Sequence, residues 1–232
     1  MARPHRPPAT SVTGGRQLMR RAERRTSLLQ AAATAFARTG FQATSMDDVA
    51  AEAGVTRLIV YRHFDSKEEL YRAVLEEVSA HLVETLDQQS GQLPVDTGTG
   101  GRVVGAMLAV ARRNPDGFRL LWVHARREPA FADYAAEIRR GAVAFAEELA
   151  GPNAPGAEPL HRWSVDFMVT AAVESVLGWL EHGDPAHDDD FVALATEGLR
   201  AMIVAWAGAG AGNGTATRVT TAGAAAPPRP AG

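Results

Sequence analysis

Apolar side chains recur at a helical spacing along most of this chain, and clusters of Pro, Gly and Asn separate one periodic block from the next. The blocks predict helices at about 20–38, 45–53, 56–64, 66–89, 101–113, 118–127, 130–150, 159–182 and 188–207. The chain is therefore predicted to be all-α.

The window from residue 44 to residue 70 has the most specific pattern. Ser45 can cap a short helix, and Asp48 stands three residues later, where its side chain can bond back to the cap. One apolar face follows at positions i, i+3, i+4 and i+7, formed by Met46, Val49, Ala50 and Ala53. Gly54 then permits the left-handed backbone that turns the chain. A second helix completes a predicted helix-turn-helix at 45–64.

This second helix would pack through Val60 and Phe64, which leaves its other side chains exposed. The exposed set offers cations for phosphates or guanine edges, polar donors, and apolar groups for thymine methyls. These are respectively Arg57, Arg62 and Lys67; Tyr61 and His63; and Leu58 or Ile59. A solvated basic face is the alternative interpretation. The coincidence of turn, helices and basic side chains in one window favours DNA recognition.

Several motifs of this window resemble, in order and without gaps, the N-terminal domain of the TetR family of transcriptional regulators. They are Ala43-Thr44-Ser45, Val49-Ala50, Ala53-Gly54-Val55-Thr56, Val60-Tyr61-Arg62-His63-Phe64 and Ser66-Lys67-Glu68-Glu69-Leu70. The resemblance covers residues 22–82. It implies an all-helical homodimer that binds a palindromic double-stranded DNA operator. It further implies that a small molecule entering a C-terminal helical domain releases the DNA.

The resemblance also implies particular DNA contacts. These are a phosphate contact for Thr44, base or phosphate contacts for Thr56, Arg57, Tyr61 and His63, and a phosphate contact for Lys67. The chain departs from the family at Leu58 and Ile59, where members often carry a small residue followed by Thr or Ala. This departure concerns base preference and not the docking of the domain.

Four segments are expected along the chain. Residues 1–19 lack periodicity and are predicted to be a disordered basic leader, and residues 208–232 hold few large side chains and are predicted to be a disordered tail. Between them we expect a DNA-binding domain at 20–82 and a ligand-binding and dimerisation domain at 83–207. An arginine cluster is predicted to neutralise phosphates beside the recognition helix, and it comprises Arg16, Arg20, Arg21, Arg24 and Arg25.

Charge is divided unevenly between the two ends of the sequence. Residues 1–67 hold 11 Lys and Arg against 5 Asp and Glu, a net +6, whereas residues 68–232 hold 13 against 22, a net −9. A basic head on an acidic body fits a protein that docks one end on a polyanion. Cysteine is absent and no run of apolar residues is long enough for a membrane span, so we expect a cytoplasmic protein without disulfides.

The last two predicted helices each carry a track of small residues flanked by larger apolar ones. The candidate interface residues are Ala171, Ser175, Gly178, Gly198, Met202 and Ala205. Small residues allow close approach of helices, and a two-fold axis would bury the same surface twice. Packing within one chain is the alternative. The resemblance favours a dimer, because the family pairs its final two helices in a four-helix interface.

A sensor cavity would need an apolar lining with a few polar groups. The candidate lining residues are Phe118, Trp122, His124, Trp163, Phe167 and Met168. The same residues at helical spacing are also typical of an ordinary core. They are compatible with a mostly apolar small-molecule effector of unknown identity, and no cofactor is predicted.

Other features favour plainer interpretations. The acidic run 188–190 suits the first turn of a helix, where the dipole stabilises negative charge, so no metal site is predicted beside His182 and His187. The sequence holds no nucleophile-base set and no phosphate-binding glycine loop, so no enzyme activity is predicted. The main expectation is a ligand-responsive repressor, with repression taken from the family's usual mode. A helical protein-interaction adaptor with non-specific DNA affinity is the alternative.

Overall fold

The computed structural model describes residues 12–90, 99–150 and 159–212. Within these ranges the chain is helical and contains no strand, which confirms the predicted all-α class. The long helices are α1 (Val12–Ala43), α4 (Lys67–Ser90), α5 (Thr99–Arg113), α7 (Ala132–Ala150), α8 (Leu160–His182) and α9 (Asp188–Gly212). The short elements are α2 (Met46–Glu52), α3 (Arg57–Tyr61), α6 (Pro115–Arg119), the π-helix η1 (Leu120–His124), and the 3-10 helices η2 (Ala125–Arg127) and η4 (Pro185–His187).

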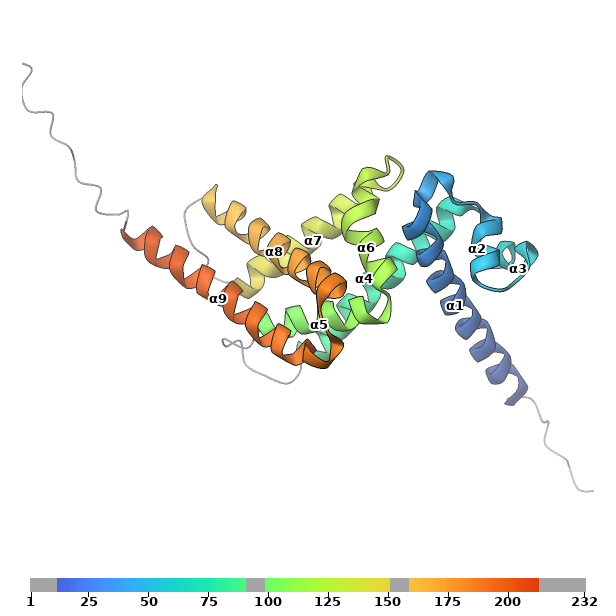
Figure 1. The fold of residues 1–232 in the computed structure, drawn as a ribbon, viewed down its shortest axis with the longest axis horizontal. Coiled ribbons are helices and arrows are strands. Elements are labelled where there is room, and N and C mark those ends of the chain that lie inside the picture. The colour runs from blue at the N-terminus through green and yellow to red at the C-terminus, as the bar shows by residue number, and fades with distance from the viewer. Residues whose placement is uncertain (1–11, 91–98, 151–158, 213–232) are drawn as a thin grey trace, which may run out of the picture.

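The elements form two parts, which Figure 1 shows side by side. Helices α1, α2 and α3 gather at one end and are called the head below. Helices α5 to α9 pack into a body, and α4 runs from the head into it.

Some predicted boundaries differ from the observed ones. Helix α1 begins at Val12 and not near Arg20, so residues 12–19, predicted as part of a disordered leader, are helical. Helix α9 continues to Gly212, beyond the predicted end at residue 207. The predicted helix 118–127 is divided among α6, η1 and η2. Residues 1–11 and 213–232, the rest of the predicted leader and tail, lie outside the described residues.

Local signals position the two short helices of the head as predicted. The Ser45 N–H donates to Asp48 Oδ2 at 2.8 Å, and the Asp48 N–H donates to Ser45 Oγ at 3.2 Å, which is the expected capping box. Gly54 has a φ of 63°, which residues with a Cβ rarely adopt, and it turns the chain between α2 and α3. Val60 and Phe64 are buried and hold α3 against the head.

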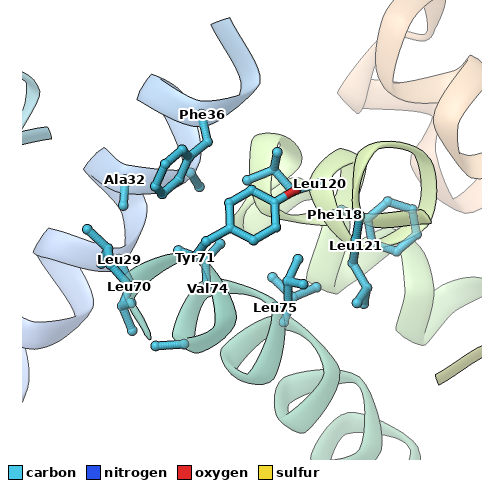
Figure 2. Close-up of a cluster of buried hydrophobic side chains, with 14 of the residues drawn as sticks. Leu29, Ala32, Phe36, Leu70, Tyr71, Val74, Leu75, Phe118, Leu120 and Leu121 are labelled. Atoms are coloured by element: carbon cyan, nitrogen blue, oxygen red, sulfur yellow. The ribbon is translucent and has the colours of Figure 1, made fainter. Parts of the chain in front are cut away.

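An aromatic cluster joins the head to the body. The Tyr71 ring on α4 lies 5.0 Å from Phe36 of α1, 5.1 Å from Phe41 of α1, and 4.4 Å from Phe131, which precedes α7. Figure 2 shows Tyr71 between side chains of α1 and of α6 and η1. All four rings are buried. These four rings therefore pack α1, α4 and the segment before α7 against one another.

The body is built around α5, which contacts α4, α6, α8 and α9. Arg112 of α5 donates to both carboxylate oxygens of Asp188, the first residue of α9, at 3.0 and 2.7 Å. Trp179 Nε1 of α8 donates to the same carboxylate at 2.7 Å. In the described part of the chain, no helix combines the length and apolar character needed to cross a membrane.

Candidate functional site

Helix α3 and the two residues that flank it present a set of exposed side chains, called the recognition surface below. It comprises Thr56, Arg57, Leu58, Tyr61 and Arg62. Leu58 is 62% exposed, so it has little packing role within the protomer and is free to meet an apolar group of a partner. Thr56 caps α3 without a side-chain capping bond, which leaves its hydroxyl available.

Arg57 is held by two neighbours on this surface. Its Nη1 donates to Asp47 Oδ2 of α2 at 2.7 Å, and its Nη2 donates to Tyr61 Oη at 3.2 Å. The guanidinium also lies 5.1 Å from the centre of the Tyr61 ring. The Tyr61 hydrogen bond and the negative charge of Asp47 raise the pKa of Arg57, so the side chain stays charged.

Thr44 lies away from the recognition surface. It is 1% exposed, and its hydroxyl donates to the Gly40 carbonyl at 2.6 Å and contacts Thr39 Oγ1 at 2.7 Å. A buried and engaged hydroxyl is not available to a phosphate. This geometry therefore does not favour the Thr44 hydroxyl as the group that makes the predicted phosphate contact.

Lys67 has a structural role besides any DNA contact. Its Nζ donates to the Phe41 and Gln42 carbonyls at 2.8 and 3.2 Å and lies 4.5 Å from the Phe41 ring centre. It therefore satisfies carbonyls at the end of α1, where a cation is favoured. The ammonium has a third N–H besides the two that these carbonyls accept. His63 is half-buried beside Phe64, with 6.4 Å between the ring centres.

Of the five arginines predicted to neutralise phosphates, Arg24 and Arg25 have side chains that the structure describes, and both lie on α1. Arg24 is exposed, and the Arg25 guanidinium lies 4.7 Å from the ring centre of Phe64, just after α3. This contact brings a cation of α1 beside the recognition surface. The side chains of Arg16, Arg20 and Arg21 lie outside the described residues.

A cavity of about 580 Å³ lies within the body, lined by α4, α5, η1, α7, α8 and α9. Most of its lining is apolar and includes Leu86, Met107, Trp122, Phe145, Met168 and Ile203. The charged lining residues Asp87, Glu137 and Arg200 are exposed and therefore lie at the mouth. The volume is typical of a small-molecule site, and its interior suits an apolar ligand.

The predicted lining residues are only partly brought together. Trp122 and Met168 line the cavity, whereas Phe118 is buried in the core and His124 is half-buried elsewhere. Trp163 and Phe167 are 56% and 40% exposed on α8, where both pack against the Trp206 ring at 5.6 Å. Trp206 does line the cavity, so this outer aromatic cluster adjoins it.

Sequence reasoning missed the wall that α7 contributes. Ile138, Ala142, Phe145 and Leu149 all line the cavity. Their spacing of four, three and four residues marks one face of a helix. That stripe was a usable signal, but a stripe alone does not tell a cavity wall from a core face.

The outer faces of α8 and α9 are apolar and exposed. Of the predicted interface residues, Gly178, Gly198 and Ala205 are exposed and Ala171, Ser175 and Met202 are half-buried. Leu194 of α9 is 76% exposed on the same side as Gly198 and Ala205, and Val204, which is 60% exposed, lies further round the helix. Proteins often use exposed apolar side chains of this kind in interactions.

The acidic turn at the start of α9 has structural partners. Asp188 accepts hydrogen bonds from Arg112 and Trp179, and Asp184 caps η4 through the Ala186 N–H at 2.9 Å. Within the described ranges, His, Cys, Asp and Glu side chains form no group of three that could hold a metal ion.

Comparison with known proteins gives a consistent result. Residues 28–74 match the family described as bacterial regulatory proteins, tetR family. The transcriptional activator FasR of Mycolicibacterium smegmatis is 29% identical over 189 residues, which cover 81% of this chain and 84% of FasR. The transcriptional repressor KstR2 of Rhodococcus jostii is 42% identical over 69 residues, which cover 30% of this chain and 31% of KstR2.

The fold is also shared with solved structures. The transcriptional regulator FadR of Bacillus subtilis, in complex with stearoyl-CoA, superposes with a TM-score of 0.58 at 14% identity. The superposition covers 75% of this chain and 98% of that one. At this identity the likeness concerns the fold.

Proposed function

Because this chain belongs to the TetR family of bacterial transcriptional regulators, we propose that it binds a palindromic DNA operator as a homodimer and responds to a small molecule. The proposed parts are a DNA-binding domain at 20–82 and a ligand-binding and dimerisation domain at 83–207. The observation that carries the proposal is a basic recognition surface joined, through packed helices, to an apolar cavity.

DNA binding is supported by the chemistry of the recognition surface. Arg57 and Arg62 can donate to guanine edges or phosphates, and Leu58 can contact a thymine methyl. Arg25, next to Phe64, supplies a further cation beside α3. The exposed apolar face of α8 and α9 supports the homodimer, since a two-fold axis there would cover it twice.

The cavity supports an elongated apolar effector, and we propose a long acyl chain. A methylene group fills about the space of a water molecule, roughly 30 Å³, so 580 Å³ has room for an unbranched chain of on the order of 19 carbons. The charged residues at the mouth would leave a polar head group outside. The FadR structure with stearoyl-CoA provides a precedent for such a ligand in this fold.

A short path connects the cavity to the head. Leu121 and Trp122 line the cavity from η1, which continues α6. On α6, Asp116 Oδ2 accepts a hydrogen bond from Thr34 Oγ1 of α1 at 2.8 Å. A ligand that displaces η1 would therefore pull on α1, and we propose that this movement changes the separation of the two recognition helices in the dimer.

Repression is proposed as the sign of regulation, on the precedent of KstR2 and the family's usual mode. In that case the effector releases the operator. FasR is an activator, so activation is the alternative sign of regulation.

The test is selection of bound sequences from random duplex DNA at two salt concentrations, followed by addition of stearoyl-CoA or acetyl-CoA. We expect an enriched palindrome whose affinity falls steeply with salt. Stearoyl-CoA should release it, and acetyl-CoA, which shares the head group, should not. If nothing is enriched by the folded protein, a protein-interaction adaptor replaces the regulator. If the palindrome is bound but neither compound acts, the acyl-chain effector is wrong.

A further inference from the structure

The carboxylate of Asp47 stands against the first residue of the recognition helix. Asp47 Oδ2 accepts the hydrogen bond of Arg57 Nη1 at 2.7 Å, and the two side chains are 60% and 57% exposed. Asp47 does not make the capping box of α2, because Asp48 does so with Ser45. Its carboxylate is therefore directed to Arg57 and not to the backbone of its own helix.

The Asp47–Arg57 ion pair contributes little to the stability of the fold. Exposed ion pairs contribute little to stability, because water and salt screen them. The effect on the guanidinium is larger. Asp47 and the Tyr61 hydroxyl fix two of its nitrogens, so the orientation of the remaining N–H donors is set before any partner arrives.

A carboxylate in this position discriminates between two partners that Arg57 can meet on DNA. A phosphate that pairs with Arg57 brings its negative charge close to Asp47, and like charges repel. A guanine edge presents neutral O6 and N7 acceptors and suffers no such repulsion. The carboxylate thus weakens the sequence-independent contact more than the sequence-specific one.

We propose that Asp47 is a specificity-determining residue of the DNA-binding surface, which positions Arg57 toward a guanine edge and opposes its transfer to a phosphate. This inference rests on the proposed function. It adds an acidic residue of α2 to a recognition surface that otherwise belongs to α3.

The test compares Asp47→Asn with a matched control, Glu52→Gln. Glu52 lies on the same helix and pairs with Arg38 of α1, also at 2.7 Å, so its substitution removes the same charge and the same kind of ion pair. Affinities for the selected operator and for scrambled DNA are measured across a salt series, and sequence selection is repeated with each variant. Thermal unfolding confirms that each variant is folded.

We expect Asp47→Asn to reduce the ratio of operator affinity to scrambled-DNA affinity by roughly tenfold. Scrambled DNA should bind more tightly, with a salt slope steeper by about 0.9, the equivalent of one added phosphate contact. The preference for guanine should relax at one symmetric pair of operator positions, and Asp47→Glu should restore it in part. Glu52→Gln should change both affinities by the same factor.

Two failures are distinguishable. An equal effect of Asp47→Asn on both DNAs, with the base preference intact, would overturn the inference and leave the proposed function in place. A parent protein that selects no sequence at any salt concentration would overturn the proposed function, and the inference with it.

Discussion

At the scale of single residues, Thr44 has a structural role. The resemblance implies a phosphate contact for this residue, whereas its hydroxyl bonds within the protomer. Its hydroxyl donates to the Gly40 carbonyl, at the residue where a φ of 81° interrupts α1, and also contacts Thr39. The Gly40 carbonyl also accepts from the Thr44 backbone N–H at 3.2 Å, so the backbone and the side chain of Thr44 both bond to the residue at the break in the helix.

We expect Thr44→Val to lower the free energy of unfolding by about 1–2 kcal/mol, because Val keeps the shape of the side chain but removes the hydrogen bonds of its buried hydroxyl. The ratio of operator to scrambled-DNA affinity should stay unchanged. Urea unfolding and DNA titration measure the two quantities. The matched control is Thr56→Val, whose exposed hydroxyl makes no capping bond, so it should change stability by less than about 0.5 kcal/mol. A loss of DNA affinity without loss of stability in Thr44→Val would restore the phosphate contact.

Residues whose roles depend on near neighbours were predictable from the sequence. Ser45 with Asp48, and Gly54, need only the positions a few residues away, and the structure has them as predicted. Lys67 differs, because its acceptors are the carbonyls of Phe41 and Gln42. These residues precede the helix-turn-helix in the sequence, whereas Lys67 follows it. Local periodicity carries no information on such pairs, nor on which apolar stripes enclose a cavity and which fill a core.

At the scale of elements, Asp188 ties three helices together. Its place in the first turn of α9 was predicted from the helix dipole, but its bonds from Arg112 of α5 and Trp179 of α8 were not. The hydrogen bonds from Arg112, and then that from Trp179, lower the pKa of Asp188 below its ordinary 3.8. The ionised side chain of Asp188 therefore stabilises the packing of α5, α8 and α9. These three helices line the cavity.

We expect Asp188→Asn to destabilise the protein by about 1–3 kcal/mol near neutral pH, since hydrogen bonds between charged groups are lost. The folded-state pKa is lowered, so the contribution is fully present above the unfolded-state pKa and is lost as pH falls through the folded-state value. The difference between parent and variant should therefore shrink below pH 3.8. Urea unfolding from pH 7 to pH 3 measures it. Asp189→Asn, an exposed neighbour in the same turn, should show only a small dipole effect. A difference that persists unchanged at pH 3 would contradict this role of the charge.

The contact between α1 and α6 can be used to test how effector binding in the body affects DNA binding by the head. Thr34→Val removes the hydrogen bond from Thr34 to Asp116 and should weaken the coupling between effector and operator by about fivefold, or roughly 1 kcal/mol. Operator affinity is measured with and without a saturating effector. Asp116→Asn keeps an oxygen that can accept from Thr34, so it should retain most of the coupling. Full release of the operator by the effector in Thr34→Val would show that the movement reaches the head by another route, such as the Tyr71 cluster.

At the scale of the whole molecule, the proposed homodimer would join two bodies through α8 and α9 and present two basic heads to the DNA. Two heads can reach successive major-groove faces only if the bodies associate, and the recognition helices then lie about 34 Å apart or a multiple of it. Association also raises the effective concentration of the second head once the first is bound. A substitution that prevents dimerisation should therefore also weaken binding to the operator.

The Gly198→Glu variant tests this prediction, because it should prevent dimerisation without unfolding the protomer. A Cβ at Gly198 would meet no atom within 4 Å in the protomer, and Gly is unfavourable inside a helix, so the variant should remain folded and gain helix propensity. A carboxylate buried against the partner would disfavour the dimer. We expect a monomer by sedimentation, an affinity for the full palindrome at least about 100-fold weaker, and an unchanged affinity for one half-site. Ala136→Glu, on the exposed side of α7, adds the same charge and should change none of these. If Gly198→Glu sediments as a dimer and binds the palindrome like the parent, the subunits meet through another surface.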